Sequence, residues 1–298
     1  MINYNKFVEN SRKWLKNYIQ TNHLQSLVIG VSGGIDSTVS CAIAASVCDE
    51  LNIPLIGRSL PCNTNKKDEN DTAILVGKSF CTDFKVVSIE PMYRVIDNEL
   101  ELNEGILNPL QQGNIKARLR MIYLRNLASI HKGVVLDNDN FTEWNLGFWT
   151  VGGDSPMDIN LGLHYLWKTE IYELADYLCD EYMESTIPIK HSKQSEAILK
   201  SMKLTPTDGN GVSNSDCEQF GLDNYEQVDD VLKTMYFDEN HAWDCPNEKG
   251  DSEYIRLIDS YNEQGVDKVM CLHQVTEYKR QPAPIIPTPE ELEIREYV

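Results

Sequence analysis

Basic residues are scarce in this chain. It carries 27 Lys and Arg against 46 Asp and Glu over 298 residues, which gives a formal net charge of -19 and a pI of about 4.7. A protein that binds nucleic acid without sequence preference needs a basic surface, so this balance argues against a nucleic-acid partner. An anionic substrate must instead be met by a local cluster of cations that acts against the overall field. Solubility or tolerance of salt is the alternative explanation of the acidity.

Long apolar runs and paired cysteine motifs are also missing. No apolar run approaches the roughly 18 residues of a membrane-spanning helix, and the first residues do not have the pattern of a signal peptide. The eight cysteines are scattered, with no Cys-x-x-Cys pair among them. We therefore expect no membrane partner, and a cytoplasmic protein with free thiols.

A glycine-rich string is present, but it lacks the Lys-Ser/Thr of a Walker loop. It follows the apolar run 27–29, precedes an Ala- and Val-rich stretch, and reads Gly30-Val31-Ser32-Gly33-Gly34-Ile35-Asp36-Ser37. This order predicts a strand, a tight turn and a helix whose N-terminal amides bind an anion. The serine hydroxyls add donors, and the Asp36 carboxylate could hold a metal ion beside bound phosphates. An ordinary glycine turn is the alternative interpretation.

Apolar periodicity predicts alternating strands and helices over the first half of the chain. Strands are expected at residues 26–31, 53–57, 84–89 and 134–136. Helices are expected at residues 4–20, 37–51, 68–79, 93–100, 115–131 and 168–182. This alternation predicts a doubly wound α/β fold, with a mostly parallel five-stranded sheet, helices on both faces and a helical C-terminal part. Ligands of such sheets bind at the carboxyl ends of the strands, where the glycine string should lie.

A single domain is expected over residues 1–298, with a nucleotide-binding core at about 22–185. Residues 204–222 are poor in apolar side chains and rich in Gly, Asp, Asn, Ser and Thr, so a mobile loop is expected there. The helical C-terminal part and tail cover about 223–298, with helices near 227–235 and 253–261 and irregular structure in the Pro-rich segment 280–284. The polar insertion 235–253 holds His241 and Cys245, which are too few ligands for a metal site.

Several motifs in a fixed order carry a family resemblance. Besides the glycine string, they are Gly113-Asn114-Ile115-Lys116-Ala117-Arg118-Leu119-Arg120-Met121-Ile122, Asp139-Asn140-Phe141-Thr142-Glu143, Gly147-Phe148-Trp149-Thr150, Gly153-Asp154, Asp158-Ile159-Asn160, Leu166-Trp167-Lys168-Thr169, Pro206-Thr207 and Glu277-Tyr278-Lys279-Arg280. Over residues 4–286 the chain resembles the ammonia-dependent NAD synthetases, which are ATP pyrophosphatases of the PP-loop superfamily. No glutaminase-type segment accompanies these motifs, so we expect the short form that uses free ammonia.

The resemblance implies a ligase that acts as a homodimer. Its reactants would be ATP, deamido-NAD and ammonia, and its cofactor Mg²⁺. ATP transfers AMP to the nicotinate carboxylate and releases pyrophosphate, after which ammonia attacks the acyl adenylate and gives NAD and AMP. A carboxylate brought to an ATP phosphate sets like charges against each other, so cations must gather at such a site.

The resemblance also implies roles for individual residues. The predicted metal ligands are Asp36 and Glu143. The predicted catalytic residues are Asp36, Lys168 and Asp158. The predicted ATP site comprises Gly30, Val31, Ser32, Gly33, Gly34, Ile35, Asp36, Ser37, Asn138, Lys168 and Thr207. The predicted deamido-NAD site comprises Arg118, Asp158, Tyr278 and Lys279.

Plainer interpretations of three of these residues remain open. Glu143 could be a carboxylate in the first turn of a helix, and Lys168 a solvated lysine at a helix start. Arg118 shares a helix face with Arg125, away from Lys116 and Arg120, and such a charged stripe is usually solvated.

The chain departs from the family pattern at four positions. Val151 replaces a Lys, Tyr278 replaces a His, and Asn138 replaces a Thr expected at ATP. Ser59 stands where an Arg is expected, with Arg58 beside it. The first two changes concern the dinucleotide, so they affect the pose, affinity and identity of the acid. Two other functions therefore stay open: another PP-loop ATP pyrophosphatase or amidotransferase that uses a different carboxylate, and a non-catalytic nucleotide-binding homologue.

Overall fold

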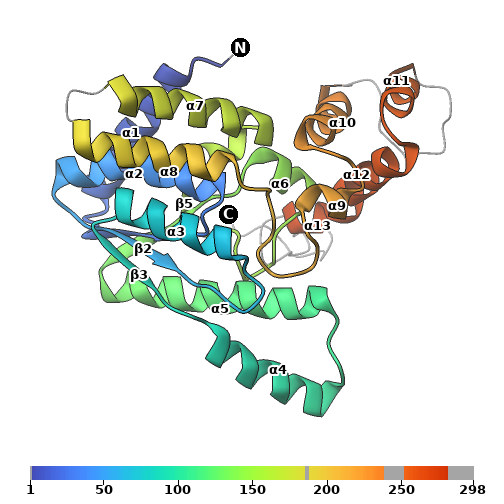
Figure 1. The fold of residues 1–298 in the computed structure, drawn as a ribbon, viewed down its shortest axis with the longest axis horizontal. Coiled ribbons are helices and arrows are strands. Elements are labelled where there is room, and N and C mark those ends of the chain that lie inside the picture. Colours follow the sequence, from blue (N-terminus) through green and yellow to red (C-terminus); the bar gives the residue numbers. More distant parts are fainter. Residues whose placement is uncertain (1, 185–187, 238–251, 281–298) are drawn as a thin grey trace, which may run out of the picture.

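One parallel sheet forms the centre of the molecule. The computed structural model describes residues 2–184, 188–237 and 252–280 (Figure 1). The strands are β1 (Ser26–Gly30), β2 (Leu55–Ser59), β3 (Asp83–Val86), β4 (Gly133–Asp137) and β5 (Ile159–Asn160). They lie in the order β3–β2–β1–β4–β5, and every pairing is parallel. The chain therefore moves outward from β1 to β3 and returns to β4 on the other side of β1, which makes a switch point between β1 and β4.

Helices cover both faces of the sheet (Figure 1). One face carries α1 (Tyr4–Thr21), α2 (Ile35–Leu51), α3 (Lys67–Phe80), α7 (Lys168–Glu184) and α8 (Pro188–Met202). The other face carries α4 (Glu90–Glu104) and α5 (Pro109–Ile130). Because it is covered twice, β1 is buried and apolar, as the central strand of a parallel sheet requires. The predicted doubly wound α/β fold is confirmed.

The C-terminal helices form a second, smaller core beside the sheet layers (Figure 1). The elements here are α6 (Phe141–Leu146), α9 (Asp216–Phe220), α10 (Tyr225–Phe237), α11 (Ser252–Ser260), α12 (Glu263–Val275) and α13 (Glu277–Arg280), and the 3₁₀ turn Leu163–Tyr165 lies between β5 and α7. Asp229 of α10 joins this core to the sheet. Its carboxylate accepts hydrogen bonds from Thr142 Oγ1 at 2.5 Å, Thr169 N at 2.9 Å and Thr169 Oγ1 at 2.8 Å. The starts of α6 and α7 are thereby held by one side chain.

Several predicted boundaries are wrong. The long helix α5 begins at Pro109 rather than at 115, because Asn108 and Gln111 form a reciprocal capping box with bonds of 3.0 and 2.9 Å. Residues 216–220 of the predicted loop form α9, because Cys217 and Phe220 are buried in the second core. Residue 280, placed in an irregular tail, ends α13.

Other differences are additions. The sequence pattern missed β5, α6, α8, α12 and α13. Strand β3 ends at residue 86 rather than 89. The part of the insertion that holds His241 and Cys245 lies outside the described residues. No helix within the described ranges is long and apolar enough to cross a membrane.

Candidate active site

The glycine string connects β1 to α2 at the switch point of the sheet. Gly33 has a φ of +90°, and a Cβ atom there would lie 2.6 Å from the Glu69 carbonyl oxygen and 2.8 Å from the Ala73 amide nitrogen. Only glycine therefore allows the turn to lie against α3. Gly34 is the N-cap residue of α2, and no side chain from the described residues caps this helix. The first amides of α2 are left to bind an anion.

Hydroxyl groups surround this turn. Ser32 Oγ and Ser37 Oγ lie 3.1 Å apart, and the Gly34 amide donates to Ser32 Oγ at 3.1 Å. Ser201 Oγ of α8 donates to the Gly33 carbonyl at 2.7 Å. The turn is thus fixed by its own serines and by a distant helix, which is the preorganisation that phosphate binding needs.

A buried lysine joins two carboxylates from different elements. Lys168 Nζ, at the start of α7, lies 2.6 Å from Asp36 Oδ2 and 3.0 Å from Glu143 Oε1. Asp36 belongs to the first turn of α2, and Glu143 to the first turn of α6. Asn140 completes the group, since its Nδ2 donates to Asp36 Oδ1 at 2.9 Å. Two carboxylates and one ammonium group therefore meet where β1 and β4 end.

Burial dominates the electrostatics of this group. The pKa of Glu143 is raised to about 7, because burial and the charge of Asp36 raise it by more than the charge of Lys168 lowers it. For Lys168, burial alone would lower the pKa, but Asp36 and Glu143 raise it well above its usual value. Lys168 is consequently a permanent cation at this position.

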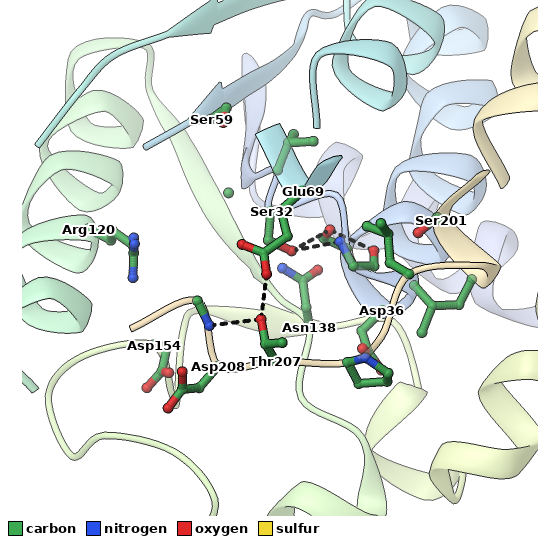
Figure 2. Close-up of a pocket in the computed structure, with 18 of the residues that line it drawn as sticks. Ser32, Asp36, Ser59, Glu69, Arg120, Asn138, Asp154, Ser201, Thr207 and Asp208 are labelled. Carbon is green, nitrogen blue, oxygen red and sulfur yellow. Dashed lines mark hydrogen bonds between the residues drawn. The ribbon is translucent and has the colours of Figure 1, made fainter. Parts of the chain in front are cut away.

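A cavity of about 290 Å³ opens at the ends of β1, β2 and β4 (Figure 2). This volume is close to the lower end of the range of roughly 300–1,000 Å³ for small-molecule sites. The predicted residues that line it are Gly30, Val31, Ser32, Gly34, Ile35, Asp36, Ser37, Asn138, Glu143, Lys168 and Thr207. Every residue predicted to bind ATP thus lines the cavity except Gly33, which faces α3.

The segment after α8 closes one side of this cavity. Thr207 Oγ1 donates to Glu69 Oε1 of α3 at 2.7 Å (Figure 2). Thr64 Oγ1 donates to the Gly209 carbonyl at 3.2 Å, and Lys66 Nζ donates to the carbonyl of residue 214 at 2.9 Å. The predicted loop therefore lies across the cavity and is held by the connection between β2 and α3. Its mobility remains a prediction.

All four residues predicted to bind deamido-NAD lie outside this cavity. Arg118 is exposed on α5, and its Nε donates to the Val151 carbonyl at 3.3 Å. Asp158 accepts from the Val135 amide at 2.8 Å and pairs with Arg125 at 2.9 Å. Asp158 lines a second pocket whose other residues are Asp137, Trp144, Pro156, Met157, Ile159, Asn160 and His164.

The C-terminal pair lies on α13. Tyr278 is 57% exposed. Lys279 Nζ donates to the Gly147 carbonyl at 2.6 Å and to the Trp149 carbonyl at 2.5 Å. Lys279 thus ties the last described helix to the segment after α6, and it does not line the main cavity.

Sequence reasoning missed other residues of the cavity, namely Glu69, Arg120, Asp154 and Asp208 (Figure 2). Arg120 stands two positions after Arg118 in the same motif, so the sequence did contain a signal. Helical spacing places the two arginines on different faces of α5, but it does not tell which face meets the cavity. Ser59 and Arg58 both line the cavity, and the guanidinium of Arg58 is bound to Asp83 at 2.9 Å.

The donor set of the site suits one kind of metal ion. Among the described residues no group of three or more His, Cys, Asp or Glu side chains is placed to hold a metal. Asp36 and Glu143 could supply two carboxylate oxygens, and the remaining ligands would have to come from phosphates and water. Magnesium is commonly held in this way, by one or two carboxylates plus the phosphates of a substrate.

The chain is similar to known NAD synthetases. A family model described as NAD synthase matches residues 7–283. An NH(3)-dependent NAD(+) synthetase from Finegoldia magna is 32% identical over 231 residues, which cover 78% of this chain and 85% of the relative. One from Thermoplasma volcanium is 28% identical over 282 residues, covering 94% and 97%.

Solved structures show the same fold. An NMN synthetase from Francisella tularensis has a TM-score of 0.71 at 23% identity and covers 97% of this chain and 100% of its own. An NH3-dependent NAD synthetase from Campylobacter jejuni has a TM-score of 0.67 at 18% identity, covering 96% and 100%. The comparisons confirm the predicted family, and with it the predicted enzyme class, an ammonia-dependent NAD synthetase. The chain belongs to the NAD synthase family.

Proposed function

We propose that this protein adenylates the nicotinate carboxylate of deamido-NAD with ATP and then amidates it with ammonia. A carboxylate oxygen attacks the α-phosphorus, and the bond to pyrophosphate breaks. The ammonia nitrogen next attacks the acyl carbon, loses a proton, and expels AMP as NAD forms. The observation that carries the proposal is the meeting of the glycine turn, Asp36, Glu143 and Lys168 around one cavity.

The glycine turn and α2 would bind the pyrophosphate portion of ATP. The free amides at the start of α2 and the hydroxyls of Ser32 and Ser37 provide donors for the phosphate oxygens. Lys168 adds a fixed positive charge beside them. These groups stabilise the charge that accumulates on pyrophosphate as it leaves.

Asp36 and Glu143 would hold a magnesium ion together with the phosphates. When bound, the ion would neutralise phosphate charge and so ease the approach of the anionic carboxylate. Support comes from the two carboxylates on neighbouring helix starts and from their hard oxygen donors.

The segment that carries Thr207 would keep water away from the acyl adenylate. Thr207 faces the cavity and is bonded to Glu69, so the segment spans the site between α3 and α9. An acyl adenylate hydrolyses when water reaches it, and closure of such a segment protects the intermediate until ammonia arrives.

Arg118, Asp158, Tyr278 and Lys279 would bind the rest of deamido-NAD, and the protein would act as a homodimer. The support is their family match and the position of Asp158 in the second pocket. Arg118 and Tyr278 are both exposed, so they are accessible to a long substrate or to a second copy of the chain.

The proposal is tested by product analysis with purified protein, ATP, magnesium, deamido-NAD and ammonium. We expect NAD, AMP and pyrophosphate in equal amounts, and no NAD when any one reactant is omitted. Turnover of another carboxylate with none of deamido-NAD would contradict the substrate. Binding of ATP without any product would identify the non-catalytic homologue.

A shorter acid is the second candidate substrate. Val151 and Tyr278 stand where the family pattern has cationic or potentially cationic residues near the dinucleotide, and both are exposed on this surface. The Francisella tularensis neighbour is named an NMN synthetase, so the acid form of that mononucleotide is the comparison to make. A higher kcat/KM for the mononucleotide than for deamido-NAD would establish the second candidate.

A further inference from the structure

Three cationic residues of the described chain line the cavity, and two of them form ion pairs with carboxylates. These two are Lys168, paired with Asp36 and Glu143, and Arg58, paired with Asp83. The third is Arg120. Within the described part of the chain, no ion pair to Arg120 is found. From the sequence alone, no role is predicted for this side chain.

Three neutral oxygens hold the Arg120 guanidinium. Its Nε donates to the Leu60 carbonyl at 3.1 Å, its Nη1 to Asn210 Oδ1 at 2.6 Å, and its Nη2 to Asn65 Oδ1 at 3.2 Å. A guanidinium has five N–H groups, so one N–H on Nη1 and one on Nη2 remain after these bonds. Two such N–H groups form the fork that fits a carboxylate or two phosphoryl oxygens.

The nearest acids act on Arg120 only at longer range. Burial lowers the pKa of Arg120, while Asp154, Asp208 and Glu69 oppose that effect. Glu69 is engaged with Thr207, and Asp154 Oδ1 accepts from a backbone amide at 2.7 Å. A partly buried charge that lacks a direct partner is stabilised when an anion binds to it.

We propose that Arg120 binds an oxyanion of the reactants, and that Asn210 positions it to do so. This inference rests on the proposed function. Figure 2 shows Arg120 with Asp154 and Asp208 on one side of the cavity and Asp36 on the other. The glycine turn and Lys168 serve the pyrophosphate, so Arg120 serves a different anion. That anion is the carboxylate of the acid or the phosphoryl oxygens nearer the adenosine end of ATP.

Asn210 links this arginine to the segment that covers the cavity. It is 8% exposed, and its carbonyl accepts from Lys116 Nζ of α5 at 2.9 Å. Gly209 and Gly211 on either side have φ values of +63° and +85°, so the turn is shaped to insert Asn210 between α5 and the connection after β2. Arg120 therefore makes all three hydrogen bonds only when the segment that carries Asn210 lies across the cavity. The position of this segment is thereby coupled to anion binding by Arg120.

The experiment measures binding by calorimetry in two arms. In the first arm, the ligand is a magnesium complex of an ATP analogue with an uncleavable α–β bridge. In the second arm, deamido-NAD is added with that analogue already present. Arg120→Gln should raise the Kd by about 10- to 100-fold in at least one arm, the loss expected for a charge-assisted bidentate contact. A loss in the first arm assigns the anion to ATP, and a loss in the second assigns it to the acid.

Arg120→Lys keeps the charge without the fork and guards against a folding defect in Arg120→Gln. It should bind more weakly than the wild type, with an unchanged circular dichroism spectrum. Arg94→Gln is the matched control, because Arg94 is a 66% exposed arginine of α4 paired only with Glu90 at 2.7 Å among the described residues. Unchanged Kd values in both arms for folded Arg120→Lys would overturn the proposal.

Asn210→Asp separates anion binding from a purely structural role. It keeps an acceptor for Arg120 but adds a carboxylate that competes with the incoming anion. We expect a loss of binding in the same arm as Arg120→Gln, without a loss of thermal stability. Wild-type affinity in Asn210→Asp would contradict the positioning role. Failure of the wild type to bind deamido-NAD would instead refute the proposed function, and the first arm would still test Arg120.

Discussion

Replacing Gly33 by Ala should destabilise the protein far more than the loss of one glycine elsewhere. Two physical costs add at this position. A non-glycine residue at a φ of +90° costs about 1–2 kcal/mol in backbone strain. The new Cβ atom would also overlap backbone atoms of α3 at 2.6 and 2.8 Å, and overpacking of this kind costs about 1–3 kcal/mol. The sum is about 2–5 kcal/mol of unfolding free energy.

Two other glycines separate these costs. Gly105 has a φ of +94°, and no heavy atom of the described residues lies within 4 Å of the point that a Cβ would occupy, so Gly105→Ala should show the strain alone. Gly34 has a φ of -67°, and its nearest contact would be Ser32 Oγ at 3.3 Å, so Gly34→Ala should change stability by less than about 1 kcal/mol. Urea unfolding of the three variants gives the comparison, and ATP-analogue binding reports on the turn. If Gly33→Ala costs no more than Gly105→Ala, the close approach of the turn to α3 is wrong.

Three further predictions concern other parts of the molecule. Asp36→Asn and Glu143→Gln should each reduce pyrophosphate release by about 100-fold or more with an unchanged circular dichroism spectrum, and near wild-type rates would refute their roles. Burial raises the pKa of Asp216 to about 6, so the ionised carboxylate lowers the free energy of unfolding above that pH, and this penalty disappears as the pH falls toward the ordinary pKa of 3.8. In urea titrations, Asp216→Asn should therefore be more stable than the wild type by up to about 3 kcal/mol near pH 8, and no more stable near pH 4. Lys279→Met should lower the free energy of unfolding by about 1–3 kcal/mol in thermal unfolding, because two buried carbonyls lose their donor. The control Lys268→Met, at an exposed position, should change it by no more than about 0.5 kcal/mol, and equal effects would argue against the α13 contact.

Local sequence was sufficient for four of the five strands and for most of the long helices, but not for β5 or α8. β1 is apolar because it is covered on both faces, and most residues of α2 are buried. Both elements can therefore be recognised in the sequence as continuous runs of small and apolar residues. The helices that were missed depend on tertiary contacts. α9 has only five residues within a polar stretch, and it exists because Phe220 inserts into the second core.

The candidate site was predictable as a set of positions but not as a set of partners. Asp36 and Lys168 are 132 residues apart, and only the return of the chain to β4 beside β1 brings them within 2.6 Å. The orientation of Arg120 could not be deduced either, since it depends on a segment 90 residues later that supplies Asn210. Long-range contacts of this kind leave no periodic signal in the sequence.

Asp229 connects the C-terminal helices to the residues that we propose for the reaction. Its carboxylate is bonded to Thr142 and Thr169, the immediate neighbours of Glu143 and Lys168, and Thr142 Oγ1 also accepts from the Lys168 amide at 2.8 Å. The positions of Lys168 and Glu143, which we propose take part in the reaction, therefore depend on a side chain of α10. A displacement of α10 by a fraction of an ångström would act as a lever on those positions. We therefore expect a substitution at Asp229 to shift Lys168 and Glu143 through these bonds.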